Sequence, residues 1–382
     1  MSAARRLRRI AVAALALACT GAPTSAARAG FDDLDRLVFV ANRTAPEIAV
    51  VDSASDRVIG HLGVAGVPHQ FVLSDRRGLL IASHLAPAAL TIVDLHTDET
   101  RRLDLAVSPE RLAIGPAGDV VAISSTDDDA VILLSPGDEP SIRRIDALGQ
   151  PGDLVFDRTG ELLFVASTAT AAVAVIEVAA ARVVEQIALG GGAAANPGGV
   201  HALARTPGGE LGFALHGENG LVSVLDLRAR SRRATIALPG PALEAYPTAN
   251  SQHVLVPNER DGTVSLISTW SFEESARLPG AAAVSGINTG MFDALAVVLS
   301  RDDDQAVLLD LLERRPLGTI ALPSRPETGV SAAAGTKLYV ALSGSDRLAV
   351  IDLRTRRLTA MIDGVGDQPW AVNMANALSY CH

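Results

Sequence analysis

The stretch KLYVALSGSDRLAVID, residues 337–352, contains two short apolar runs separated by a polar turn. The stretch RLVFVANRTAPEIAVVD, residues 36–52, has the same layout near the other end of the chain. Both runs have the length and the content of β-branched residues that are typical of strands, and the polar segment between them is typical of a turn. We therefore predict a pair of adjacent strands in each stretch.

Further copies of this layout occur along the whole chain. The first run of each copy ends roughly 40 to 50 positions after the previous one, at Asn42, His84, Ser125, Ser167, His216, Asn258, Ser300 and Ser343. We count the two apolar runs as the second and third strands of each unit. A polar turn and a fourth strand, such as RVVEQIAL or PLGTIAL, follow the third strand in most copies. Four strands in each unit of this length are the pattern of a β-propeller blade, so the sequence predicts an all-β, eight-bladed β-propeller.

The two ends of the chain complete each other. Residues 367–374 are a first strand without the rest of its blade, whereas residues 36–62 are three outer strands without a first one. We expect these segments to form one blade, because a closed ring leaves no exposed strand edges. The domain prediction is therefore one propeller over residues 30–382, with a short C-terminal tail at 375–382.

The repeat resembles the YVTN family of bacterial propellers, in RLVFVAN with IAVVD, in KLYVALS with LAVID, and in LVSVLDL. That resemblance covers the whole mature chain and implies a propeller fold, whereas YVTN-like proteins include periplasmic binding proteins, surface proteins and relatives of enzyme domains. Eight blades are also similar to the haem-d1 domain of cytochrome cd1 nitrite reductase and its biogenesis relatives. The chain has no Cys-x-x-Cys-His motif, so we expect no c-type haem.

Residues 1–29 have the features of a secretory signal peptide: an arginine-rich start, a short apolar run and the small-x-small sequence ARA. The alternative of a lipoprotein, anchored through Cys19, stays open. We predict a periplasmic protein that is not an integral membrane protein, because no other apolar run approaches the length of a membrane span.

Loss of these residues removes five arginines and no acid, which takes the formal charge of the chain from −10 to −15. An acidic surface argues against nucleic acid as a partner and tolerates cations. We expect a monomer whose partner is another periplasmic protein.

Two blades carry histidines at matched positions. His69 and His84 are fifteen positions apart, as are His201 and His216. In a symmetric hairpin, positions with a constant index sum lie opposite each other, so each pair is predicted to be a cross-strand neighbour pair. The first strand of a blade lines the central channel, and these pairs lie where that strand begins. We therefore place them at the mouth of the channel. The same offset predicts the other opposed pairs: Trp370–Asn42, Glu110–Ser125, Gly152–Ser167, Leu243–Asn258, Ser285–Ser300 and Glu327–Leu342.

Paired imidazoles are metal ligands, although a histidine at the end of a strand can also serve only to bond a turn. Glu110 and Glu327 fall at the same predicted mouth, and the tail could bring Cys381 and His382 as soft ligands. The predicted metal ligands are His69, His84, His201, His216, Glu110, Cys381 and His382. The acidic turns Asp127–Asp129 and Asp302–Asp304 lack the glycine and the distal glutamate of a calcium loop, so we interpret them as solvated turns.

These observations favour a non-enzymatic periplasmic binding protein for a transition metal, copper or zinc, or for a metal-bearing cofactor, and it could act as a metallochaperone. Two alternatives stay open. One is an oxidoreductase or cofactor-maturation protein of the haem-d1 or copper type, although haem d1 is the less favoured cofactor. The other is a ligand-free interaction scaffold. The sequence contains no phosphate loop, nucleophile elbow or metalloprotease helix that would mark a catalytic site.

Overall fold

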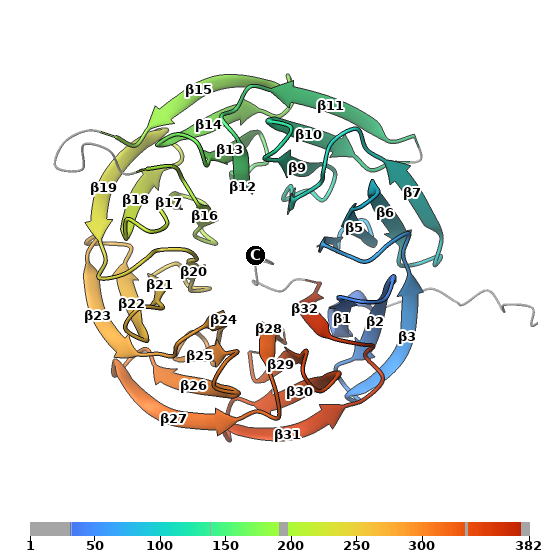
Figure 1. Cartoon of the computed structure of the whole chain (residues 1–382), viewed down its shortest axis with the longest axis vertical. Coiled ribbons are helices and arrows are strands. Elements are labelled where there is room, and N and C mark those ends of the chain that lie inside the picture. Colours follow the sequence, from blue (N-terminus) through green and yellow to red (C-terminus); the bar gives the residue numbers. More distant parts are fainter. Residues whose placement is uncertain (1–30, 32, 138, 191–197, 333–334, 376–382) are drawn as a thin grey trace, which may run out of the picture.

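The computed structural model describes residues 31, 33–137, 139–190, 198–332 and 335–375. They form eight four-stranded antiparallel sheets arranged as a ring (Figure 1). The predicted eight-bladed β-propeller is confirmed. A single 3-10 turn, Leu34–Arg36, is the only helical element of the described residues, and none of their helices has the length and hydropathy needed to cross a bilayer.

Each blade runs from an innermost strand near the axis to an outermost strand at the rim, and we number the blades from the N-terminus. The innermost strands of blades 1 to 8 are β32 Pro369–Met374, β4 Gln70–Ser74, β8 Arg111–Ile114, β12 Pro151–Phe156, β16 Ala202–Arg205, β20 Tyr246–Pro247, β24 Val284–Gly290 and β28 Pro326–Ser331. The second strands are β1 Leu37–Asn42, β5 Leu79–Leu85, β9 Val121–Ser125, β13 Leu162–Ser167, β17 Leu211–Leu215, β21 His253–Asn258, β25 Leu295–Ser300 and β29 Lys337–Leu342.

The outer half of each blade completes the sheet. The third strands are β2 Glu47–Asp52, β6 Ala88–Asp94, β10 Ala130–Ser135, β14 Ala172–Glu177, β18 Leu221–Asp226, β22 Thr263–Ser268, β26 Gln305–Asp310 and β30 Arg347–Asp352. The outermost strands are β3 Arg57–Gly63, β7 Thr100–Asp104, β11 Ser141–Asp146, β15 Arg182–Ala188, β19 Ser231–Ala237, β23 Glu274–Pro279, β27 Arg315–Ala321 and β31 Arg357–Ile362.

The core lies between neighbouring blades. Strand β1 is buried at every position, because both of its faces pack against another sheet, whereas the outermost strand β3 alternates between buried and more exposed residues. Val40 of blade 1 and Tyr339 of blade 8, for example, belong to one apolar cluster. Strands buried on both faces read as continuous apolar runs in the sequence, which is why the inner runs of the repeat were recognisable.

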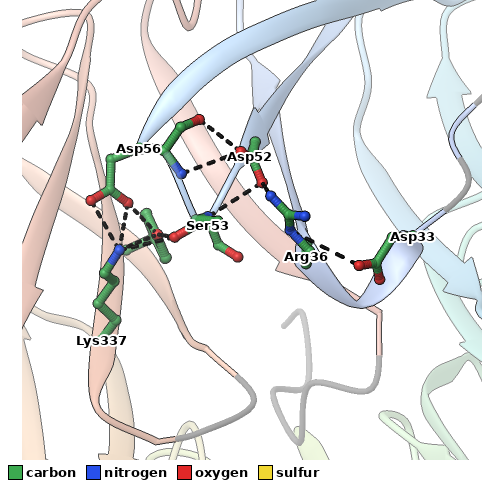
Figure 2. A network of polar contacts seen from close by, with 9 residues as sticks. Asp33, Arg36, Asp52, Ser53, Asp56 and Lys337 are labelled. Atoms are coloured by element: carbon green, nitrogen blue, oxygen red, sulfur yellow. Dashed lines mark hydrogen bonds and ion pairs between the residues drawn. The ribbon is translucent and has the colours of Figure 1, made fainter.

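The ring closes as the sequence predicts, through antiparallel pairing of β32 with β1. A polar network lies where blade 8 meets blade 1 (Figure 2). The Nζ atom of Lys337, the only lysine of the chain, lies 2.8 and 2.9 Å from the carboxylate oxygens of Asp56 and donates to the carbonyl of Ser53 at 2.9 Å. The buried hydroxyl of Tyr339 also donates to Asp56, at 2.6 Å. These bonds link the two blades.

The predicted opposed pairs are wrong by one residue in four blades. A bulge at the start of the innermost strand makes the partner Pro369, Pro151, Val284 or Pro326 in place of Trp370, Gly152, Ser285 or Glu327. The residue just before each bulged strand has a positive φ, between 41° and 57°. Such a bulge adds one residue to one strand only, so it moves the register by one and turns the following side chain toward the opposite face.

The histidine-bearing blades keep the predicted register. Their ladders pair Gln70 with Ser83 and Ala202 with Leu215, which are the pairings expected if His69 faces His84 and His201 faces His216. Each ladder ends one residue short of the two histidines.

Candidate functional site

The second strands end, and the innermost strands begin, on one face of the ring, which we call the upper face. His69, His84, His201, His216 and Glu110 all lie there, within or next to these strand ends. The sequence therefore located this set of side chains correctly on the fold. Their individual environments differ.

His84 and His216 are both buried, and both ring nitrogens of each are hydrogen-bonded. Nδ1 of His84 lies 3.1 Å from the carbonyl of Val67, and its Nε2 lies 2.7 Å from the hydroxyl of Thr91. Nδ1 of His216 lies 3.1 Å from the carbonyl of Gly198, and its Nε2 lies 2.9 Å from the hydroxyl of Ser223. A carbonyl only accepts, so Nδ1 carries the proton and Nε2 accepts from the hydroxyl. A metal ion at either Nε2 would have to displace that hydroxyl.

An asparagine makes a comparable bond in blade 6. Nδ2 of Asn258 donates to the hydroxyl of Ser265 at 2.8 Å, and Ser265 lies seven residues further on, as Thr91 and Ser223 do from their histidines. The buried side chain at the end of the second strand thus joins the second strand to the third.

Burial lowers the pKa of both His84 and His216, against the opposing effect of the carbonyls they contact. Both rings are therefore neutral at pH 7.

His69 is half-buried and belongs to a different environment, formed by the next blade. The backbone of Glu110 and the charged groups of Glu110 and Arg111 lie close enough to this ring to shift its pKa. Burial and then Arg111 lower the pKa of His69, while Glu110 raises it. The carboxylate of Glu110 is positioned by one bond, in which the backbone N–H of Thr126 donates to Oε1 at 3.2 Å. Imidazole and carboxylate thus lie next to each other at the junction of blades 2 and 3.

His201 is exposed at the start of β16. Its backbone N–H donates to the carbonyl of Leu215 at 2.7 Å, which fixes the main chain. A Cβ atom added to Gly217, whose φ is +53°, would lie 3.6 Å from the Cβ of His201, so the turn after His216 passes close to this residue. His201 is accessible, and blade 6 has Leu243 at the position that Glu110 occupies in blade 3.

The other residues that the sequence singled out fall into three groups. Glu327 is buried on the upper face and bonded to two arginines. Cys381 and His382 lie outside the described residues. The acidic turns accept hydrogen bonds from the backbone of neighbouring loops. Asp129 accepts from the N–H groups of Leu148 and Gln150 at 3.1 and 2.8 Å, and Asp304 accepts from the N–H group of Arg325 at 2.5 Å. Within the described ranges, no group of three or more His, Cys, Asp or Glu side chains could hold a metal ion.

One cluster was not predicted from the sequence: Arg43, Arg301 and Trp370 lie around Glu327. Arg43 and Arg301 come directly after the ends of their second strands, at Asn42 and Ser300. An arginine follows the strand end in these two blades alone among the eight copies. An arginine at that position of the repeat is therefore the sequence feature that could have pointed to the cluster.

Solved structures share the fold of this chain. Dihydro-haem d1 dehydrogenase NirN in complex with DHE has a TM-score of 0.76 at 14% identity, over 92% of this chain and 78% of that chain. Apo AztD from Citrobacter koseri has a TM-score of 0.69 at 14% identity, over 90% of this chain and 99% of AztD. Hydrazine synthase of Kuenenia stuttgartiensis has a TM-score of 0.55 at 16% identity, over 75% of this chain and 95% of that chain.

Identities this low establish a common fold and nothing finer. No protein-family model matches the chain, and no curated protein matches it by sequence. The propeller architecture therefore rests on structure, and the ligand has to be inferred from the residues on the upper face.

Proposed function

We propose that the protein is a binding protein that holds a transition metal, copper or zinc, or a metal-bearing cofactor on the upper face of its propeller. His69 is the principal protein ligand in this proposal. Glu110 is the second donor, and His201 is an accessible ligand three blades away. The two histidines lie in different blades, so each would serve a separate ion or a different part of one large ligand.

The position of the His69 ring beside the backbone and the carboxylate of Glu110 carries the proposal. A metal-ligating histidine usually donates one ring N–H to a backbone carbonyl or a carboxylate, which sets the tautomer and aims the other nitrogen at the metal. The lowered pKa keeps this ring neutral at pH 7, and the neutral ring is the form that binds metals. His84 and His216 take no part in this proposal because both of their nitrogens are occupied.

The propeller relatives support a ligand of this class. NirN was solved with DHE bound, on a fold that covers most of this chain. That likeness also favours a second candidate, a cofactor-maturation oxidoreductase of the haem-d1 type, in which the same face would hold the cofactor during reaction. A coloured protein on purification would favour this second candidate, whereas a colourless protein that binds zinc or copper would favour the first.

Other features of the proposal come from the sequence. The YVTN-like repeat, the signal peptide at residues 1–29, the periplasmic location, the monomeric state and a periplasmic protein partner belong to it as expectations. Mass spectrometry of the protein secreted to the periplasm would give the cleavage site and show whether Cys19 is retained with a lipid.

The test is metal binding by the purified mature protein, titrated with zinc and with copper after removal of bound metal. We expect His69→Ala to raise the Kd about 10- to 100-fold, the range that disruption of a metal ligand's environment causes. His201→Ala should have the smaller effect, and Glu110→Gln an intermediate one. A double variant, Cys381→Ser with His382→Ala, tests the predicted contribution of the tail.

His61→Ala is the matched control. His61 is exposed and has a ring nitrogen bonded to the carbonyl of Gly364 at 2.9 Å, but it lies on the outermost strand β3. Equal metal affinity in His69→Ala, His61→Ala and the parent protein would refute the proposal. Absence of metal binding in all three, with no change of the absorption spectrum on adding hemin, would leave the interaction scaffold as the better function.

A further inference from the structure

We infer that the upper face carries an oxyanion-binding site in which Arg43 and Arg301, held side by side by Glu327, bind a carboxylate or phosphate group. The three residues come from blades 1, 7 and 8, which are neighbours in the ring (Figure 1). The site uses none of the histidines, so it extends beyond the proposed metal binding and can be tested apart from it.

Glu327 is the anchor of the cluster. Its Oε1 accepts from the hydroxyl of Ser343 at 2.7 Å. Its Oε2 lies 3.3 Å from Nη2 of Arg43, and 3.0 and 2.8 Å from Nε and Nη2 of Arg301. Both guanidinium groups therefore bond to the same oxygen atom, which brings them together although they belong to loops 258 positions apart in the sequence.

This arrangement differs from the other ion pairs of the described chain. Glu327 is the only carboxylate there that pairs with two arginines, and its side chain is 4% exposed, whereas the other paired acids are 14% to 78% exposed. One carboxylate compensates one of the two positive charges. The three side chains of the cluster therefore carry a net charge of +1, next to a group that has been withdrawn from solvent.

The arginines keep donors for a ligand. Their side chains are 49% and 37% exposed, and the bonds to Glu327 use only part of each guanidinium fork. No other hydrogen-bond partner of either guanidinium is found among the described residues. Arginine offers five N–H donors in a planar fork that matches the oxygens of carboxylates and phosphates. Two such forks fixed by a shared anchor require little ordering when an oxyanion binds.

Trp370 fixes the Arg43 side of the site. The guanidinium carbon of Arg43 lies 5.6 Å from the centroid of the Trp370 ring, within the range of a cation–π contact. A hydrogen bond also connects blade 8 to blade 1 here, since the hydroxyl of Thr328 donates to the backbone carbonyl of Trp370 at 2.9 Å. An anion that binds Arg43 would change the electrostatic environment of this indole, which gives the site a spectroscopic reporter.

The experiment uses Trp370 as the only tryptophan. The chain has two, and the other, Trp270, is 85% exposed in the turn between β22 and β23, so Trp270→Phe provides the parent protein. Fluorescence is recorded on the metal-free protein during titration with citrate, succinate and inorganic phosphate. We expect a saturable change with at least one of the three anions, and the anion that acts distinguishes a carboxylate ligand from a phosphate ligand.

Arg43→Gln and Arg301→Gln are each expected to raise the Kd of that anion at least 10-fold. Arg144→Gln is the matched control, because Arg144 has similar exposure, 41%, and pairs with Asp146 on the outermost strand β11. Arg43→Lys and Arg301→Lys keep the charge but lose the fork, and should also weaken binding. These conservative variants replace the glutamine variants should the latter fail to fold.

His69→Ala should bind the anion as the parent does, so failure of the metal proposal and failure of this one are distinguishable. The inference is overturned by the absence of a saturable change with any of the three anions. It is equally overturned by the same Kd in the parent, in the arginine variants and in Arg144→Gln.

Discussion

Blade 2 and blade 5 carry histidines at the same two positions of the repeat, yet the four rings have different roles. The histidines of the second strands, His84 and His216, are nearly identical in burial and in bonding. The histidines that precede the innermost strands differ: His69 is half-buried against Glu110, whereas His201 is exposed.

The difference shows which part of a blade is self-contained. The end of a second strand is bonded within its own blade, to the third strand and to the loop that enters the blade, so equal sequences give equal environments. The start of an innermost strand faces the next blade, so the neighbour decides its chemistry. Blade 3 has Glu110 and Arg111 there, and blade 6 has Leu243 and Glu244.

The largest effect on stability is expected at the second-strand positions. His84→Ala and His216→Ala each remove a buried ring and its two hydrogen bonds, one to a buried hydroxyl and one to a carbonyl. We expect each to lower the free energy of unfolding by about 2–4 kcal/mol. Urea denaturation measures this. Similar losses in both variants would confirm that the two positions are equivalent, and unequal losses would break the comparison.

Asparagine is the matched replacement, since Asn258 bonds the corresponding third-strand hydroxyl in blade 6, with its amide N–H as the donor. His84→Asn and His216→Asn should recover about half of the stability that the alanine variants lose, because one hydrogen bond is restored while part of the ring volume is not. No difference between asparagine and alanine at these positions would show that packing, and not hydrogen bonding, determines the histidines.

A smaller effect is expected from pH. Burial holds the pKa values of His84 and His216 below the ordinary value of 6.5, so the unfolded chain takes up protons at a higher pH than the native protein does. The stability due to the neutral rings is therefore fully present above pH 6.5 and is lost as the pH falls from there through the native pKa values.

The double variant His84→Asn with His216→Asn should lose less stability than the parent between pH 7 and pH 5 in urea denaturation. The pKa values of His69 and His253 are lowered as well, so the profile becomes shallower and does not become flat. A profile as steep as that of the parent would contradict the assignment.

The smallest effects on stability are expected at the positions before the innermost strands. His201→Ala should change the free energy of unfolding by less than about 0.5 kcal/mol, as exposed substitutions do. His69→Ala should cost about 1 kcal/mol, because it removes a half-buried ring that lies beside the next blade. Thermal unfolding of both variants gives the values, and a larger loss in His201→Ala would show that the two environments are wrongly distinguished.

The sequence by itself determined the fold, the number of blades, the closing blade and the face that carries the candidate ligands. It could do so because strands that are buried on both sides must be apolar throughout, and because a repeated unit places equivalent residues at equivalent heights in the ring. The register inside blades 2 and 5 followed from the symmetry of a hairpin. The four bulges did not follow, since a residue with positive φ before a strand leaves no regular mark on the apolar pattern.

Only the tertiary structure decided what each polar residue does. The fifteen-residue spacing could not show that His84 and His216 have both nitrogens engaged, because their partners lie on another strand and in a separate loop. The sequence could not show that Glu327 bonds to both Arg43 and Arg301, since these residues are far apart in the chain and come together only when the ring closes. Hydrogen bonds and ion pairs depend on distances across blades, and the folded ring sets those distances.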